Sequence, residues 1–269
     1  MNKEQLAKIL TAVEAIALRA GRFILEQRQA VSADMIETKS LNSLVSYVDK
    51  EAEKMIIEAL KDLVPGAGFI AEEGTVTKRG EQYNWIIDPL DGTTNFLYDV
   101  PVFAVSIALA SADAIEVGVV YECGRDELFS AYRGGGAYLN GKVISVAKQD
   151  TVKESLLATG FPYYDFERMQ SFNTLLAKLY PNSRGLRRMG SAATDLAYVA
   201  CGRFNAYFEY GLSPWDVAAG ILLVQEAGGK VSDFKGGDNY LFSAEIIASS
   251  SKIYDEFLGL LQEHLPSKA

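Results

Sequence analysis

Hydrophobic and polar residues follow two different patterns along the chain. In two early segments apolar residues recur every three to four positions, which predicts amphipathic helices over residues 3–28 and 44–63. Short apolar runs separated by turn residues follow, and they predict the successive strands of a meander. Asn140-Gly141 is the clearest of these turns, because this dipeptide suits a two-residue hairpin. The predicted strands of the meander are residues 102–110, 115–122, 128–132 and 142–146.

Beyond about residue 151 the rhythm changes, and strand-like runs alternate with helix-like ones. This alternation is typical of α/β architecture, whereas the first half has the separated helices and strands of an α+β protein. Because no long polar linker divides the halves, we predict one unit over residues 1–269 with two lobes, at about 1–150 and about 151–269. The predicted strands here are 156–160, 185–189, 204–209, 230–234 and 246–249, and the predicted helices are 166–180, 191–201, 215–227 and 251–264.

Two carboxylates stand where a further apolar run, residues 83–87, comes to its end. Asp88 follows this run directly, and Asp91 comes three residues later, ahead of Gly92 and two hydroxyl residues that are able to begin a helix. Clustered carboxylates attract hard cations such as Mg²⁺, and a helix N-terminus attracts phosphate. Asp-Pro and Asp-Gly are also ordinary turn formers, so a turn without any ligand is the alternative. The presence of further acids in comparable positions decides between the two.

Two other acids do occupy comparable positions. Glu72 ends a short apolar segment, although the adjacent pair Glu72-Glu73 could equally be solvated surface. Asp216 precedes an almost wholly apolar run, residues 217–224, which predicts a buried helix. Because Asp is a favoured helix cap, capping alone is an alternative interpretation, and it does not exclude a metal role.

Asp49 has the least ordinary position of all the acids. In the predicted helix over 44–63 it falls within the apolar face. A carboxylate in a buried stripe is strongly destabilising unless it is paired, hydrogen-bonded or close to a metal. The apolar face consists of Val45, Val48, Ala52, Met55, Ile56, Ala59 and Leu63, and the opposite face carries Lys50, Glu51, Lys54, Glu58 and Lys61.

Composition narrows the classes of function. His264, near the end of the chain, is the sole histidine, so catalysis by histidine is not expected. Cys123 and Cys201 form no C-x-x-C pattern and are interpreted as reduced thiols. The net charge of −9 argues against general nucleic-acid binding. The N-terminal segment is charged throughout, unlike a signal peptide, and no apolar run is long enough for a membrane span, so we expect a cytoplasmic protein.

The chain resembles the inositol monophosphatase family in two motifs, residues 88–95 (DPLDGTTN) and 215–220 (WDVAAG), which occur in the order and at the spacing of that family. Its members are Mg²⁺-dependent, lithium-sensitive phosphomonoesterases, and the similarity extends from about residue 44 to residue 229. The resemblance implies a layered sandwich in which helix and sheet layers alternate, combining α+β and α/β parts. It also implies a metal site at the junction of the lobes and a homodimer.

The resemblance assigns the metal ligands by position. Glu72, Asp88 and the backbone carbonyl of Leu90 would hold a first Mg²⁺. Asp88, Asp91 and Asp216 would hold a second, more weakly bound ion, and Glu72 would share a third. Two ions about 3.5–4 Å apart can clamp the entering and leaving oxygens of an in-line displacement, so no side-chain nucleophile is required.

The resemblance also assigns the residues that act on water and substrate. Thr93, paired with Asp49, would orient the attacking water and help to deprotonate it, and Asp49, Thr93 and Glu72 are the implied catalytic residues. The backbone N–H groups of Gly92 and Thr93 would receive the phosphate. The implied substrate-binding residues are Asp91, Gly92, Thr93, Gly190, Ser191, Ala192, Glu209 and Asp216.

Substrate choice is less narrowly defined. Residues 94–96 (TNF) look like those of the inositol monophosphatase branch, and Glu209 suits a polyol because a carboxylate accepts hydrogen bonds from hydroxyl groups. A small phosphorylated polyol, and myo-inositol monophosphate in particular, is therefore the implied substrate. Fructose 1,6-bisphosphate or another sugar phosphate is the alternative. Candidates for binding its second phosphate are Lys39, Arg187 and Arg188.

A binding role is the second alternative. Some bacterial members of the family also act as partners of transcription complexes. Arg184, Arg187 and Arg188 form a local basic cluster inside an acidic chain, and this cluster is the candidate contact for such a complex.

Overall fold

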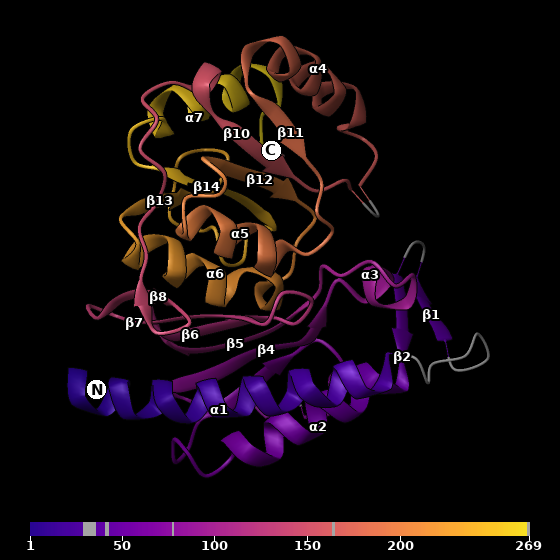
Figure 1. Ribbon diagram of the computed structural model, residues 1–269, viewed down its shortest axis with the longest axis vertical. Helices are drawn as coiled ribbons and strands as arrows, with labels where there is room; N and C mark the ends of the chain where they lie inside the picture. Colours follow the sequence, from indigo (N-terminus) through magenta and orange to yellow (C-terminus); the bar gives the residue numbers. More distant parts are fainter. Residues whose placement is uncertain (29–35, 41–42, 77, 163–164, 268–269) are drawn as a thin grey trace.

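The protein is a stack of alternating helix and sheet layers, as the computed structural model shows (Figure 1). The structure describes residues 1–28, 36–40, 43–76, 78–162 and 165–267. From one side of the stack to the other lie a helix pair, a seven-stranded sheet, a second helix pair, a five-stranded sheet and a third helix pair (Figure 1). The layered sandwich that the sequence predicts is confirmed.

The seven-stranded sheet is buried on both faces, which explains its almost continuous apolar strands. Side chains alternate between the faces, so that Trp85 and Ile87 belong to the core beneath the sheet and Ile86 belongs to the core above it. β3 and β4 are parallel, and every other neighbouring pair is antiparallel. In spatial order the strands are β3 (Gly68–Ala71), β4 (Tyr83–Asp91), β5 (Ala104–Ser111), β6 (Ile115–Glu122), β7 (Glu127–Tyr132), β8 (Gly136–Leu139) and β9 (Lys142–Val143).

The five-stranded sheet is mixed. β10 pairs in parallel with both β11 and β12, whereas β14 is antiparallel to both of its neighbours, β12 and β13. Two short 3-10 helices, η2 (Val152–Glu154) and η3 (Tyr180–Asn182), lie between its elements in sequence. In spatial order the strands are β11 (Gly185–Arg187), β10 (Leu156–Thr159), β12 (Ala206–Tyr210), β14 (Glu245–Ser250) and β13 (Gly229–Ser232).

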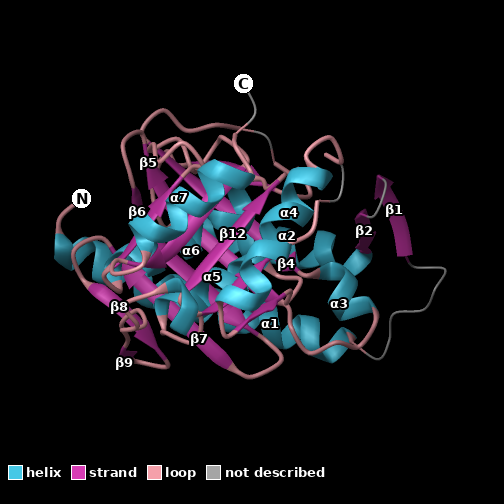
Figure 2. Ribbon diagram, turned by 90° about the horizontal axis from the view of Figure 1, so that it is seen from above, coloured by secondary structure: helices cyan, strands magenta, loops and turns pink. Residues whose placement is uncertain are grey.

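The central helices hold the two sheets together. α6 (Pro214–Glu226) is buried all around over residues 217–224, because both sheets contribute to the core that surrounds it (Figures 1 and 2). Its neighbour α5 (Ala192–Ala200) is buried along its whole length. The outer helices are α1 (Lys3–Gln27) and α2 (Tyr47–Leu60) on the seven-stranded sheet, and α4 (Met169–Leu179) and α7 (Tyr254–His264) on the five-stranded sheet.

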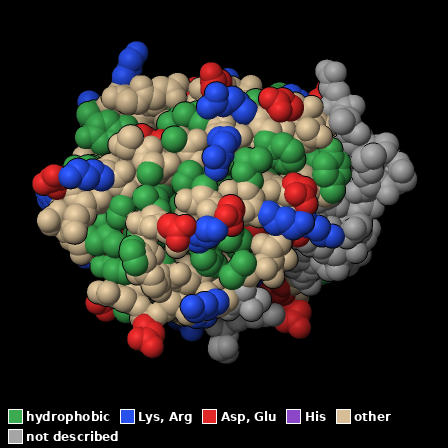
Figure 3. All heavy atoms as spheres, turned by 90° about the horizontal axis from the view of Figure 1, so that it is seen from below, with side chains coloured by type: hydrophobic (Ala, Val, Ile, Leu, Met, Phe, Trp, Pro, Cys, Tyr) green, Lys and Arg blue, Asp and Glu red, His purple; other side chains and the backbone are tan. Residues whose placement is uncertain are grey.

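The helices α1 and α2 are amphipathic, as their sequence predicts, and their outer face is exposed to solvent. Basic and acidic side chains are interspersed with apolar ones on this face, and ion pairs such as Lys8–Glu4 and Lys54–Glu51 lie along the helices (Figure 3). Of the helices that the structure describes, none combines the length and the apolar character needed to cross a membrane.

The predicted helix over 44–63 is wrong at both ends. Its first residues belong to β2 (Ser43–Ser46), which pairs antiparallel with β1 (Ile36–Ser40), and α2 begins only at Tyr47. The pairing with β1 overrides the local helical spacing, which cannot reveal a partner strand. The hairpin lies to one side of the stack beside the short helix α3 (Thr93–Leu97) (Figures 1 and 2).

Other predicted boundaries differ by a few residues. The strand predicted over 142–146 is only the two-residue β9, and β8 was not predicted because its run is short and follows three glycines. The predicted helices over 166–180 and 251–264 begin three residues later, as α4 and α7. The predicted strand over 115–122 coincides with β6.

Candidate active site

The end of β4 presents the two acids that the sequence singles out. Asp88 is 1% exposed, inside the sheet, and its carboxylate accepts the backbone N–H of Leu90 at 2.9 Å. The pairing with β5 slips between Asp88 and Asp91, which is consistent with Pro89 lacking a ladder N–H. This irregularity lets the strand deliver carboxylates to its end instead of continuing the sheet.

Three other carboxyl groups lie within electrostatic reach of Asp88. Burial raises its pKa well above the ordinary range, and the charges of Glu72, Asp91 and Asp216 raise this pKa further. Glu72 follows β3, which pairs with β4, and its backbone N–H continues the pairing by donating to Ile87 at 3.2 Å. Acids from both halves of the sequence therefore lie within electrostatic reach of one another.

This set of groups fits a hard cation. Carboxylate and backbone carbonyl oxygens are the ligands that Mg²⁺ prefers, and a bound cation would relieve the repulsion that raises the pKa of Asp88. Within the described parts of the chain, no three His, Cys, Asp or Glu side chains already converge as a preformed metal cage. The fit therefore rests on the donor chemistry and on the shared repulsion of the four acids.

Asp49 and Thr93 form the pair that the resemblance implies. Thr93 Oγ1 lies 2.9 Å from Asp49 Oδ1 and 3.0 Å from the carbonyl oxygen of Leu90. Asp49 lies in the first turn of α2 and is 1% exposed, so its predicted place in the buried face is confirmed. The hydrogen bond fixes the hydroxyl of Thr93 between the acid of α2 and the end of β4.

Glu53, one helical turn after Asp49, is a site residue that the sequence analysis missed. It is fully buried, and its carboxylate accepts the backbone N–H groups of Glu73 at 2.7 Å and Thr75 at 2.8 Å and the hydroxyl of Thr75 at 2.7 Å. These bonds hold the loop that follows Glu72. The signal was present in the sequence, because a residue four positions after Asp49 lies on the same face of the helix.

Asp91 joins β4 to the N-terminus of α5. Its carboxylate accepts the hydroxyl of Ser191 at 2.6 Å and the backbone N–H of Ala193 at 2.7 Å, in the manner of a helix cap. Burial raises the pKa of Asp91 to about 6, while the bonds from Ser191 and Ala193 oppose the rise. Asp91 thus lies beside Ser191 and Ala192, two of the predicted substrate-binding residues.

Asn95 makes a second link at the same junction. Its side-chain amide donates to the carbonyl oxygens of Val102 at 2.7 Å and Met189 at 2.8 Å. Gly92, at the start of α3, has a φ of +90°, and a Cβ there would lie 3.0 Å from the oxygen of Val102 and 3.2 Å from that of Gly190. Only glycine therefore suits this position, where the backbone at Gly92 closely approaches the backbone at Gly190.

Asp216 lies in the first turn of α6 and accepts the backbone N–H of Ser213 at 2.7 Å. The capping interpretation is therefore correct. Burial, followed by the charge of Asp91, raises the pKa of Asp216 well above its usual range. Its carboxylate caps the helix and also takes part in the acidic group.

Glu209, near the end of β12, lies within electrostatic reach of Asp91. It is 7% exposed, burial raises its pKa to about 7, and the hydroxyl of Tyr207 donates to its Oε2 at 2.5 Å. Asp195 on α5 was not predicted. It is 1% exposed, and the charges of Glu209 and Asp91 add to the effect of burial in raising its pKa. One residue in a fully apolar-looking helix gives no periodic signal that would reveal this position.

The basic residues proposed for a second phosphate do not act together. Arg188 is half-buried, with its guanidinium 5.6 Å from the ring centre of Phe161, and it lowers the pKa values of Glu209 and Asp195. Arg187 is exposed and donates to the carbonyl of Leu186. The side chain of Lys39 lies outside the described residues.

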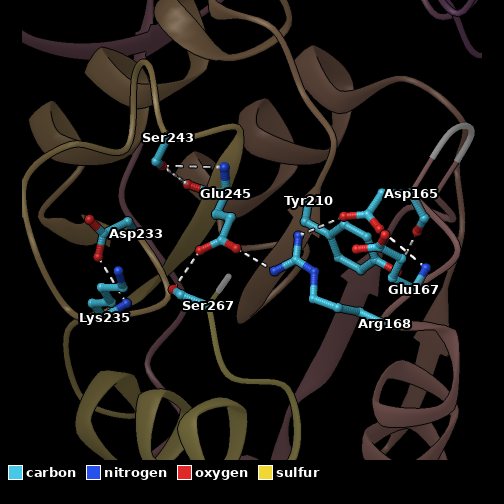
Figure 4. A network of polar contacts seen from close by, with 9 residues as sticks. All are labelled: Asp165, Glu167, Arg168, Tyr210, Asp233, Lys235, Ser243, Glu245 and Ser267. Atoms are coloured by element: carbon cyan, nitrogen blue, oxygen red, sulfur yellow. Dashed lines mark hydrogen bonds and ion pairs between the residues drawn. The ribbon is translucent and has the colours of Figure 1, made fainter. Parts of the chain in front are cut away.

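A polar network fixes the end of β12 beyond Glu209 (Figure 4). Arg168 lies over the ring of Tyr210, 4.0 Å from its centre, and forms ion pairs with Glu245 and Asp165. Glu245 also accepts the hydroxyl of Ser267 at 2.6 Å. The network ties the segment before α4 and the C-terminal segment to β12, which carries Glu209, and to β14, which pairs with it.

The fold and this arrangement of acids define a family. A model of the inositol monophosphatase family matches residues 5–265, and the chain belongs to that family, one of Mg²⁺-dependent phosphatases. The family is generally metal-dependent, in agreement with the donor set at the end of β4.

Particular relatives narrow the comparison. The chain is 42% identical over 260 residues to a protein named Nus factor SuhB of Pseudomonas aeruginosa, covering 93% of this chain and 96% of that protein. A crystal structure of the extragenic suppressor protein SuhB from Bartonella henselae is similar at 37% identity and a TM-score of 0.88, covering 96% and 100% of the two chains. An inositol monophosphatase from Anabaena is similar at 36% identity and a TM-score of 0.85, covering 97% and 98%.

Proposed function

We propose that the protein hydrolyses a phosphate monoester with the help of Mg²⁺, and that its substrate is myo-inositol monophosphate, which yields inositol and phosphate. The observation that carries the proposal is the group of four carboxyls formed by Asp88 with Glu72, Asp91 and Asp216, next to the hydrogen-bonded pair of Thr93 and Asp49. The family supports the same chemistry.

The proposed ligands follow the positions of the acids. Glu72, Asp88 and the carbonyl of Leu90 would hold one ion, and Asp88, Asp91 and Asp216 would hold a second. Glu72 would share a third. When bound, such ions neutralise phosphoryl oxygens, lower the pKa of water and stabilise the leaving alkoxide. The backbone N–H groups at the start of α3 would receive the phosphate.

The proposed general base acts through a relay. Thr93 donates its hydroxyl hydrogen to Asp49, so its oxygen is free to accept a hydrogen from the attacking water. As the water attacks phosphorus, its proton passes to Thr93 Oγ1 while the proton of Thr93 passes to Asp49. The P–O bond to the alcohol breaks, and the leaving alkoxide takes a proton from solvent water to become the free hydroxyl.

Phosphate release tests the proposal directly. We expect Mg²⁺-dependent release from myo-inositol 1-phosphate that is abolished by EDTA and reduced by lithium. Asp88→Asn should lower turnover at least about a hundredfold while the circular dichroism spectrum stays unchanged, because it removes the charge around which the acidic group is arranged. Asp113→Asn, at an exposed position on the β5–β6 turn, is the matched control. Full activity of the Asp88→Asn protein would refute the site.

Fructose 1,6-bisphosphate remains the alternative substrate. Arg188 is the one candidate for its second phosphate that lies beside Glu209 in the described structure. Assays of both esters side by side distinguish the two substrates. A higher kcat/KM for the bisphosphate would contradict the proposed substrate but would be consistent with the proposed metal-dependent hydrolysis.

A second candidate function is binding to a transcription complex. It is supported by the relatives named Nus factor SuhB, at 42% identity over most of the chain. Arg184 and Arg187 are exposed, whereas Arg188 is half-buried beside Glu209, so a surface contact would involve the first two. A double substitution, Arg184→Glu with Arg187→Glu, should abolish pull-down of RNA polymerase complexes and leave hydrolysis intact. Unchanged pull-down would exclude this patch as the contact.

A further inference from the structure

Glu209 does not stand alone at the alcohol end of the site. Tyr207 and Glu209 are two residues apart on β12, so their side chains share one face of the sheet. Tyr207 is 0% exposed, and its hydroxyl donates to Glu209 Oε2 at 2.5 Å. A hydrogen bond to a carboxylate inside a protein is short and strong, and it fixes the position of the oxygen that accepts it.

Gly160 confines the same carboxyl from a second side. It follows β10, whose Thr159 pairs with Phe208 of β12. A Cβ at Gly160 would lie 1.8 Å from Glu209 Oε2 and 2.0 Å from Oε1, far inside any allowed contact. The carboxyl therefore lies directly against the backbone at Gly160, and no larger residue leaves it in place.

The charges nearby bear on the kind of group that Glu209 can receive. Asp195 lies close enough to Glu209 for the charge of Glu209 to raise the pKa of Asp195, and Arg188 lowers the pKa of both carboxyls. Two carboxyls against one guanidinium leave no surplus of positive charge among these three residues. Hydroxyl groups, which donate hydrogen bonds, are therefore accepted more readily than a second phosphate.

We propose that Tyr207 is a positioning residue that holds Glu209 against Gly160, so that one carboxylate oxygen stays available for a hydroxyl of an uncharged polyol. This inference rests on the proposed function, because it names how the same site recognises the alcohol part of its substrate. In the described part of the chain the hydroxyl of Tyr207 hydrogen-bonds to Glu209 and not to the acids around Asp88, so its removal should affect recognition of the alcohol and not the chemistry.

Tyr207→Phe removes only the hydroxyl and tests the proposal. We expect KM for myo-inositol 1-phosphate to rise about tenfold or more with kcat within about twofold, since a site built around a hydrogen bond loses discrimination when that bond is lost. The KM for para-nitrophenyl phosphate, whose alcohol part has no hydroxyl ring substituent, should stay within about twofold. Tyr210→Phe is the matched control, because Tyr210 is on the same strand and its hydroxyl donates to the carbonyl of Asp165 instead.

A second variant tests the same proposal independently, in case the Tyr207→Phe substitution disturbs folding. Gly160→Ala should displace the Glu209 carboxyl without removing any hydrogen-bonding group and should give the same rise in KM for the polyol ester alone. An equal rise for both esters, or no rise in either variant, would overturn the positioning role. A purely structural role predicts that equal rise, together with a lowered melting temperature.

Calorimetric binding of myo-inositol 1-phosphate with Ca²⁺ in place of Mg²⁺ separates this inference from the proposed function. If the wild type releases no phosphate but binds the ester about tenfold more tightly than the Tyr207→Phe protein, hydrolysis is contradicted and the positioning role stands. If the two proteins bind it equally, the positioning role fails, whether or not the wild type is an active phosphatase.

Discussion

Individual residues in this site serve two purposes at once. Asp91 caps α5 and Asp216 accepts the backbone N–H of Ser213, the N-cap residue of α6, yet both also raise the pKa of the buried Asp88. The hydrogen bonds at the helix ends fix each carboxylate in place and oppose the rise that burial causes in its own pKa. The acids therefore lie close enough together for their shared charge to attract a cation.

At the residue scale, Thr93→Ala separates the proposed relay from metal binding. The substitution removes the hydroxyl that bonds to Asp49 but none of the proposed metal ligands. We expect kcat to fall about a hundredfold or more, within the range of general-base catalysis, while the Mg²⁺ dependence stays unchanged. Thr94→Ala, at the exposed neighbouring position, is the control. A weaker affinity for Mg²⁺ with unchanged kcat would contradict the relay.

Glu122 gives a pH-dependent prediction away from the metal site. It is fully buried at the end of β6, where burial raises its pKa to about 7 and the charge of Glu127 adds to the rise. The folded protein keeps a proton that the unfolded chain releases near pH 4.5, so the free energy of unfolding falls as the pH rises from about 4.5 to about 7. Glu122→Gln keeps the neutral shape, and its melting temperature should exceed that of the wild type by more at about pH 8 than at about pH 5. Equal differences at both pH values would refute this.

The residues that sequence reasoning found and missed differ in the signal they give. Asp49 was found because it breaks an apolar helical stripe, and its neighbour Glu53 was available from the same stripe. Tyr207 and Asp195 could not be found in this way. A tyrosine in an apolar strand is interpreted as a core residue from sequence alone. Only the folded chain shows that the hydroxyl of Tyr207 donates to Glu209.

At the scale of elements, the local sequence pattern predicted most helices and strands. It failed where pairing with another strand determines the structure. Residues 44–46 have apolar spacing that fits a helix, but they pair as β2 with β1. By contrast β6, buried on both faces, was predicted at both boundaries, because its long apolar run needs no knowledge of its neighbours.

The contact of α6 with β6 gives a prediction at this scale. A Cβ at Gly118 would lie 2.8 Å from the carbonyl oxygen of Ala219, so helix and strand approach at van der Waals contact only because Gly118 has no side chain. Gly118→Ala should lower the free energy of unfolding by about 1–3 kcal/mol, as overpacking does. Gly259→Ala, inside α7 with open space around it, should raise it by about 0.5–1 kcal/mol. Chemical denaturation measures both, and a neutral Gly118→Ala would contradict the close approach.

At the scale of the whole molecule, the homodimer implied by the resemblance stays a prediction. Tyr98 and Val100, in the loop between α3 and β5, are 75% and 42% exposed, and exposed apolar residues of this kind favour association. Light scattering should give a mass of twice the 29.4 kDa of one chain. A mass of 29.4 kDa across a range of concentrations would contradict it.

The central helix layer limits how the coding sequence can be divided or recombined. α5 and α6 come from the second half of the chain, yet they cover the upper face of the sheet that the first half builds. A gene fragment ending near residue 150 would encode a sheet with one face bare and a site without Asp216. An exchange of halves between relatives would therefore keep this core only if Gly118 from the first half still fits closely against Ala219 from the second.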